Sequence, residues 1–343
     1  MEKRSLAVMI IGIVAYLVYI FAYVGIDKLV YILAKVNVMM IMLSMIFLLI
    51  SILLHGLSWH ILISENVKGV SKTISATIAS LFASYVVPIG AASELVRFFI
   101  ATRLIGISVA TTVLSILVHR ISTTLAPLIA LLFLILYLRG ELVVIESATI
   151  ATILAVYLVV IVFPNVLVMG LIKTRIFEKL MRRYEKYLSR IIGDGVSTFS
   201  EEYRRSMAGL ISRPRFPLAL GISLIEWLFL VASMYAIFLA ISLNKDLVIA
   251  AVSIIMIQIL WWVLPISFAG SIGITDLLAS IAYQLLNFEP GVSASIVVIY
   301  RLVSLTSLLI LLYPSLRILG IYPREIRRIY RESQDMKTDQ AGY

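Results

Sequence analysis

Charged side chains within long apolar stretches are the residues of this sequence best placed to do chemistry. Six of them interrupt such stretches: Glu94, Arg97, Arg120, Glu226, Asp276 and Arg301. Placing a charge at the centre of a lipid bilayer costs about 2.5 to 3.5 kcal/mol even on lenient insertion scales. If the stretches cross a membrane, each of these charges therefore needs a partner or a function.

The three arginines predict a site for a phosphate group. A guanidinium group binds phosphate through parallel, charge-assisted hydrogen bonds and keeps its proton in proteins. We therefore expect Arg97, Arg120 and Arg301 to form a basic substrate-binding site within the membrane. Glu94 lies one helical turn before Arg97, and we group it with the expected site.

Three further ionisable side chains are candidates for proton coupling: Glu226, Asp276 and His119.

A structural role is the alternative for all of the intramembrane charges and for His119. Glu94 would then pair with Arg97, and Arg301 with one of the other carboxylates, so that the charges lock the helices together. His119 could equally be a hydrogen-bonded packing residue. Both interpretations stay open at the level of sequence.

Two apolar regions, 73–104 and 248–287, are interrupted near their middle by proline and small residues. The motifs are PIGAAS and PISFAGSIG, and the residues expected to admit a headgroup are Pro88, Gly90, Ser93, Pro265, Ser267, Gly270 and Gly273. Small residues let a ligand approach the backbone. A helix that begins after each break would also direct its positive N-terminal end at an anion.

The remaining apolar runs predict the architecture. The 343 residues are 62% hydrophobic and 14% charged, which excludes an ordinary soluble domain. A hydrocarbon core about 30 Å thick needs about 20 apolar residues. Six runs satisfy this: 6–24, 37–62, 108–138, 148–172, 217–243 and 292–318. We expect an all-α polytopic membrane protein, a single bundle over 1–343 with six full transmembrane helices and two re-entrant hairpins.

The net charge of +10 follows membrane topology rather than nucleic-acid binding. Lys and Arg cluster at the N-terminus, in 173–215 and in the tail 319–343. Positive loops stay inside, so we expect both termini in the cytoplasm of a plasma-membrane protein. The segment 173–215 has apolar residues at helical spacing, typical of an amphipathic helix on the inner membrane surface, or it is a solvated connector. On this topology the first hairpin opens to the cytoplasm and the second to the exterior.

The two interrupted regions also resemble each other. Pro-Ile opens both motifs, Ala92 and Ala269 follow at the same offset, and His119-Arg120 and Tyr300-Arg301 lie some thirty residues later. Opposite entry sides and similar motifs together predict an inverted repeat whose broken helices meet near the bilayer midplane. Irregular backbone at that depth must line a cavity or be buried in protein.

Several kinds of site are excluded by what the sequence lacks. It has no cysteine, and its three histidines do not have the spacing of zinc ligands. The stretch 69–73 (GVSKT) lacks the first glycine, the Gly-Lys pair and the preceding strand of a nucleotide-binding loop. We therefore expect no metal, no cofactor and no enzymatic activity.

Four segments carry a resemblance to a known family. They are PIGAASELVRFFIATRLIGIS at 88–108, ILVHRIS at 116–122, LPISFAGSIGITDLL at 264–278 and VVIYRLVS at 297–304. In order and spacing they resemble the transmembrane region of the lysylphosphatidylglycerol synthases, a flippase-like family. The resemblance covers about 35–320 and implies translocation of a lipid-linked anionic substrate, such as an aminoacyl phospholipid or a polyprenyl-phosphate-linked sugar. The soluble aminoacyl-transferase domain of the synthases is not expected here.

The resemblance also implies roles for individual residues. Glu94 and Arg97 match the acidic and basic pair of the family, and Arg120 and Arg301 match its helix arginines. The chain differs at three positions, with Ser93, His119 and Asp276 where the family more often has Gly, Glu and Glu.

Two other functions remain as alternatives. An intramembrane transferase acting on polyprenyl-phosphate would need a general base and paired carboxylates that hold a metal. A membrane partner of a separate glycosyltransferase or synthase would dock that enzyme through the basic segment 173–215.

Overall fold

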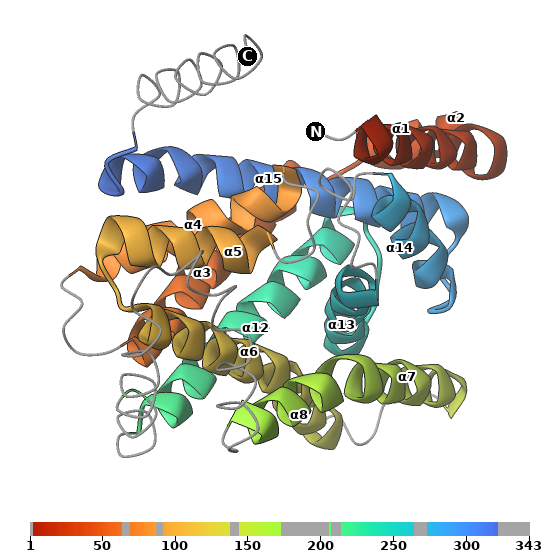
Figure 1. The fold of residues 1–343 in the computed structure, drawn as a ribbon. Helices are drawn as coiled ribbons and strands as arrows, with labels where there is room; N and C mark the ends of the chain where they lie inside the picture. The colour runs from red at the N-terminus through yellow and green to blue at the C-terminus, as the bar shows by residue number, and fades with distance from the viewer. Residues whose placement is uncertain are drawn as a thin grey trace, which may run out of the picture.

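The computed structural model describes residues 3–63, 69–86, 92–137, 144–172, 206, 214–263 and 273–321. Every regular element within these ranges is a helix (Figure 1). Five of the residues predicted to line the breaks lie outside them: Pro88, Gly90, Pro265, Ser267 and Gly270. Most of the basic segment 173–215 and the tail from 322 onward also lie outside the described residues, so the predictions made for them stay untested.

Five described helices are long and apolar enough to cross a membrane. They are Val38–Leu62 (α3), Val109–Tyr137 (α6), Arg215–Ala240 (α12), Pro290–Ile318 (α15), and Val144–Tyr157 (α7) continued through the π-helix Leu158–Val162 (η3) into Phe163–Ile172 (α8). A bent pair at the N-terminus brings the number of candidate spans to six. The prediction of an all-α polytopic membrane protein is therefore confirmed.

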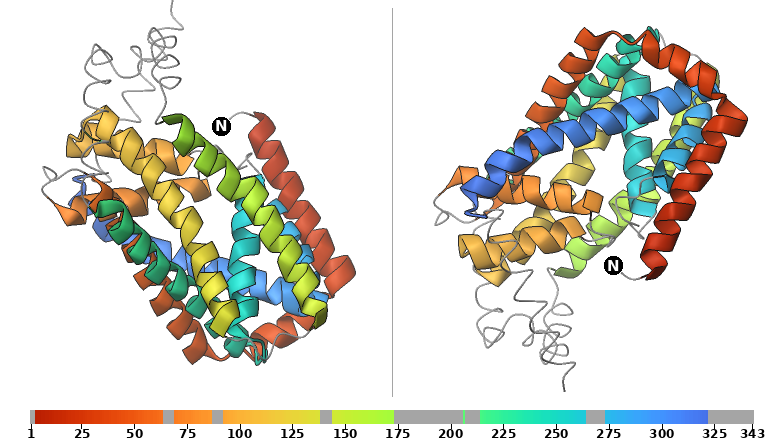
Figure 2. Two further views of the ribbon diagram at one scale, coloured as in Figure 1. Left: turned by 90° about the horizontal axis from the view of Figure 1, so that it is seen from below. Right: turned by 90° about the horizontal axis from the view of Figure 1, so that it is seen from above.

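The N-terminal pair bends at a glycine. Lys3–Val18 (α1) runs on as a π-helix, Tyr19–Val24 (η1), and Ile26–Ala34 (α2) follows at 89° to it. Gly25 between them has φ +84°, a conformation that glycine adopts without steric cost. Figure 2 shows α1 along one edge of the bundle and α2 turning across its end.

Large apolar side chains cover much of the outer surface. Met39, Phe133, Val159 and Leu302 are all at least 60% exposed. On a soluble protein so many exposed apolar side chains would mark an interface or an aggregation hazard. In a bilayer they face lipid tails, which are as apolar as they are.

The centre of the bundle is built on α3 and α12, which pack closely together. Ser44 and Ser58 of α3 hydrogen-bond to Ser233 and Ser223 of α12, each at 2.9 Å between the hydroxyl oxygens. All four serines are buried. Small side chains let two helix backbones approach, and the hydroxyl groups satisfy each other where no water is available.

Shorter helices occupy the two interrupted regions. Val70–Val86 (α4) packs beside Ala92–Phe99 (α5), which continues as the π-helix Ile100–Ile105 (η2). Leu247–Val263 (α13) and Ile274–Gln284 (α14) form the second region. The long helix α15 packs against both α4 and α14, so it joins the two regions (Figure 1). The inverted relation between them stays a prediction.

Candidate functional site

Arg97 is the centre of the first group of intramembrane charges. It lies on α5 and is only 4% exposed. Its guanidinium group donates from Nε to Ser80 Oγ at 3.3 Å, from Nη1 to His119 Nδ1 at 3.1 Å and from Nη2 to His55 Nε2 at 3.4 Å. The same group lies 5.2 Å from the ring centroid of Trp59, within the range of a cation–π contact.

These hydrogen bonds determine where the histidine protons lie. A guanidinium group can only donate, so the histidine nitrogens that face Arg97 must be bare acceptors. His55 therefore carries its proton on Nδ1, which donates to Glu226 Oε1 at 2.8 Å. A neutral His55 thus bridges the arginine of α5 and the carboxylate of α12. We call His55, Arg97, His119 and Glu226 the arginine–histidine cluster.

Glu94 and Arg120 form an ion pair beside this cluster. Glu94 Oε1 lies 3.2 Å from Arg120 Nη1, and both side chains are about a third exposed, at 32% and 34%. Arg97 interacts electrostatically with Glu94 and Arg120, and also with Glu226. The pairing of Glu94 with Arg97, the structural alternative at the level of sequence, is not the contact that forms.

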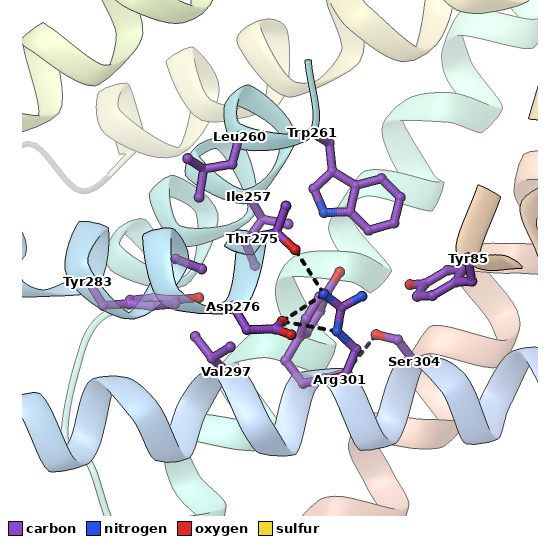
Figure 3. Close-up of a pocket in the computed structure, with 12 residues that line it drawn as sticks. Tyr85, Ile257, Leu260, Trp261, Thr275, Asp276, Tyr283, Val297, Arg301 and Ser304 are labelled. Atoms are coloured by element: carbon purple, nitrogen blue, oxygen red, sulfur yellow. Dashed lines mark hydrogen bonds and ion pairs between the residues drawn. The ribbon is translucent and has the colours of Figure 1, made fainter. Parts of the chain in front are cut away.

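The second group of charges is a direct ion pair between α14 and α15. Asp276 Oδ1 accepts from Arg301 Nη2 at 2.6 Å and from Arg301 Nε at 3.0 Å (Figure 3). Arg301 Nη2 also donates to Thr275 Oγ1 at 3.1 Å. The other oxygen of Asp276 accepts from the backbone N–H of Gly273 at 3.0 Å, which places the carboxylate at the positive end of α14.

A small cavity adjoins this ion pair. Its volume is about 30 Å³, and Tyr85 of α4, Trp261 of α13, Asp276 and Arg301 are among the residues that line it. The rings of Tyr85 and Trp261 meet edge to face, with centroids 5.5 Å apart. Since a water needs about 10 to 15 Å³ of such space, the cavity has room for water but not for a lipid headgroup.

The cavity lies where the two interrupted regions meet. Tyr85 precedes the first break by three residues and Trp261 precedes the second by four, whereas Asp276 follows the second break. Figure 3 shows these side chains converging from α4, α13, α14 and α15 on the guanidinium group of Arg301.

The two ion pairs occupy corresponding places in the chain. In each, the carboxylate lies on the short helix after a break, and the arginine follows on the next long helix. Arg120 comes 26 residues after Glu94, and Arg301 comes 25 residues after Asp276. This recurrence supports the idea of a repeat, which hydropathy alone suggests only weakly.

Arg97, Arg120 and Arg301 were predicted to form one site, whereas the structure distributes them between two groups. Of the other predicted residues, Ser93 is half-buried on α5 and Gly273 precedes α14 with φ +93°. His55 and Tyr85 were not predicted. The available signal for His55 was an ionisable side chain in the apolar run 37–62, the same signal that identified the six charges.

Within the described ranges, no group of three His, Asp or Glu side chains is arranged to hold a metal ion. Each intramembrane carboxylate has a different basic partner. Glu94 binds Arg120, Glu226 binds His55, and Asp276 binds Arg301.

Comparison with known proteins gives one match. The family model described as the lysylphosphatidylglycerol synthase TM region matches residues 5–311. No curated protein matches the chain, and no solved structure does. The match covers most of the chain and indicates a function connected with membrane lipid. This multi-pass membrane protein therefore belongs to the family of the lysylphosphatidylglycerol synthase transmembrane region.

Proposed function

We propose that this protein translocates a lipid-linked anionic substrate, such as an aminoacyl phospholipid or a polyprenyl-phosphate-linked sugar, across the bilayer. The headgroup passes between the two interrupted regions while the lipid tail stays among the acyl chains. The observation that carries this proposal is Arg301, whose side chain is 16% exposed and which pairs with Asp276 beside a cavity that both regions line. A basic group at such a place is a functional-site candidate by default.

A phosphate group would bind by exchange with Asp276. Arg301 commits Nε and Nη2 to that carboxylate. A phosphate that takes over these donors keeps the guanidinium charge balanced, so it avoids the large cost of an unpaired buried charge. Asp276 also keeps a partner during the exchange, because the N–H of Gly273 still holds its other oxygen.

Passage requires the cavity to open. At about 30 Å³ it holds no headgroup, so α4 and α13 must move apart where Tyr85 and Trp261 touch. We propose that this ring contact is the constriction of the pathway. The Glu94–Arg120 pair, which joins α5 to α6 and is a third exposed, is the second binding position for the anion.

The proposal is tested in proteoliposomes with fluorescent phosphatidylglycerol and a fluorescent polyprenyl phosphate. The readout is the fraction of probe that an impermeant quencher reaches with time. Loss of a charge-assisted contact worth about 1.5 to 3 kcal/mol predicts about a 10- to 150-fold slower movement in Arg301→Gln. Arg317→Gln, at the exposed end of the same helix, is the matched control and should move lipid at the wild-type rate.

If the protein accelerates neither probe, or if Arg301→Gln moves lipid at the rate of the control, translocation through this site is wrong.

The location in the plasma membrane with cytoplasmic termini also belongs to this proposal. Because the sequence has no cysteine, a single cysteine added at either end reports its side by reaction with an impermeant thiol reagent in intact cells.

The absence of enzymatic activity stays a prediction. An intramembrane transferase would need two carboxylates side by side, whereas Glu94, Glu226 and Asp276 each face a different base. Turnover of polyprenyl phosphate in the same proteoliposomes would favour the transferase.

A further inference from the structure

Two polar atoms of the arginine–histidine cluster are buried without a hydrogen-bond partner in the described part of the chain. They are Nε2 of His119 and Oε2 of Glu226. The residues are 2% and 8% exposed. A buried polar atom without a partner costs about 1 to 3 kcal/mol, so each such atom calls for an explanation, such as a bound water, an ion or a catalytic role.

We propose that Glu226 is a proton-binding site, and that its proton and the anionic headgroup bind together. A proton that adds to Glu226 Oε2 removes the negative charge that faces Arg97 through His55. The arginine keeps its hydrogen bonds to Ser80, His119 and His55 but lacks a countercharge, which an anion supplies. This inference rests on the proposed translocation, because it supplies the coupling between a proton gradient and movement of the headgroup.

The hydrogen-bond geometry selects Glu226 over the two histidines. The accepting nitrogens of His55 and His119 lie 3.4 and 3.1 Å from the nitrogens of Arg97. A proton added at either nitrogen would set two donors and two positive charges against each other. Oε2 of Glu226 has a lone pair that no described group uses.

The other carboxylates are less suited to the role. Asp276 accepts two hydrogen bonds from Arg301 and one from the backbone of Gly273, so a proton must displace a charged partner. Glu94 contacts Arg120 directly. Glu226 instead faces its arginine only through a neutral ring, so a proton on Oε2 displaces no charged partner.

Charges on every packed element bear on Glu226. α3 contributes His55; α5 contributes Glu94 and Arg97; α6 contributes His119 and Arg120. α13, which also packs against α12, has no charged residue between 247 and 263. α15 packs against α12 as well and contributes Tyr300 and Arg301, and Arg301 is paired with Asp276.

The charge balance of these groups is the basis of the coupling. With neutral histidines, the two positive charges of Arg97 and Arg120 balance the two negative charges of Glu94 and Glu226. Protonation of Glu226 leaves the group with one surplus positive charge within the membrane. That charge is costly unless an anion neutralises it. By linkage, proton binding must then strengthen anion binding, and anion binding must strengthen proton binding to the same extent.

The first measurement identifies the protonated group without using transport. Infrared difference spectra of the protein in nanodiscs, recorded as the pH is lowered, should show the carbonyl band of a buried protonated carboxyl group. Glu226→Gln should lack this band. Asp27→Asn, which changes an exposed acid on α2, should keep it. A band that survives in Glu226→Gln, or no band in the wild type, would overturn the assignment.

The second measurement tests the coupling in the wild-type protein, and so does not depend on the folding of a variant. Binding of short-chain phosphatidylglycerol is followed by calorimetry in buffers of different ionisation enthalpy. We expect uptake of about one proton per lipid, and an affinity that rises about tenfold for each pH unit of acidification while Glu226 is ionised. Binding without proton uptake would overturn the coupling.

The two proposals fail in distinguishable ways. Proton uptake on lipid binding without transbilayer movement would keep the proton site and reject translocation. Movement without proton uptake would keep translocation and reject the proton site. In Glu226→Gln, which mimics the protonated carboxyl group, lipid affinity should be independent of pH.

Discussion

Breaking the Asp276–Arg301 pair should destabilise the protein strongly, and the size of the effect follows from its geometry. The side chains are only 9% and 16% exposed, so solvent screens the pair weakly. Asp276→Ala removes both charge-assisted hydrogen bonds and leaves Arg301 buried without a countercharge. Loss of one partner of a buried ion pair costs about 3 to 5 kcal/mol.

The variant pair Asp276→Leu and Arg301→Met separates this effect from packing. Each single substitution leaves one uncompensated charge and should lower the free energy of unfolding by about 3 to 5 kcal/mol. The double variant leaves none, and replacing both members of such a pair by apolar residues is often close to neutral. We therefore expect the double variant to be more stable than either single variant.

Reversible unfolding in mixed micelles, followed by circular dichroism, gives the four free energies of this cycle. A coupling energy of about 2 kcal/mol or more between the two positions supports the reasoning. Single effects that add to within about 0.5 kcal/mol in the double variant would refute it, because independent sites behave in that way. The double variant should still fail to move lipid, since Arg301 is absent.

Four further substitutions test the packing and the pathway. Gly273→Ala should lower the free energy of unfolding by at least about 2 kcal/mol, because φ is +93° and an added Cβ would meet the α1 backbone at Gly12. Gly221 is helical and has open space around it, so Gly221→Ala should instead raise the free energy of unfolding by about 0.5 to 1 kcal/mol in the same unfolding assay. Ser58→Ala removes a buried bridge to α12 and should cost about 1 kcal/mol, measured likewise. Tyr85→Ala widens the constriction beside the cavity and should speed transbilayer movement of the fluorescent lipid, whereas an unchanged rate would place the limiting step elsewhere.

The crossings were predictable from sequence because hydropathy alone determines which runs enter the bilayer. The predicted run 37–62 corresponds to α3 at Val38–Leu62, and 217–243 to α12 at Arg215–Ala240. The sharp bend at Gly25 was not predicted. α2 is only 9 residues long, too short for a span, and a glycine in this setting does not by itself indicate an angle of 89°.

The partners of the charges were harder to predict than their positions. Spacing along one helix suggested Glu94 with Arg97, but the contact of Glu94 is with Arg120 of the neighbouring helix α6. Side-chain direction and helix crossing decide such contacts, and neither can be read from a single sequence. The pairing of Asp276 with Arg301 was one of two options that sequence left open, and the structure selects it.

The two groups of charges differ in a way that suits two steps of one process. Asp276 holds Arg301 directly and at 2.6 Å, so only an anion of comparable charge can displace it. Glu226 faces Arg97 through a neutral histidine, at 2.8 and 3.4 Å along the bridge, so one proton on Oε2 removes the countercharge while both hydrogen bonds of the bridge remain. Arg97 lies on α5, the helix that follows the first break, whereas His55 and Glu226 lie on the closely packed α3 and α12. A proton at Glu226 would therefore leave the charge of Arg97 on the short helix without its countercharge, and the anion that then binds restores the charge balance while the headgroup passes toward Arg301.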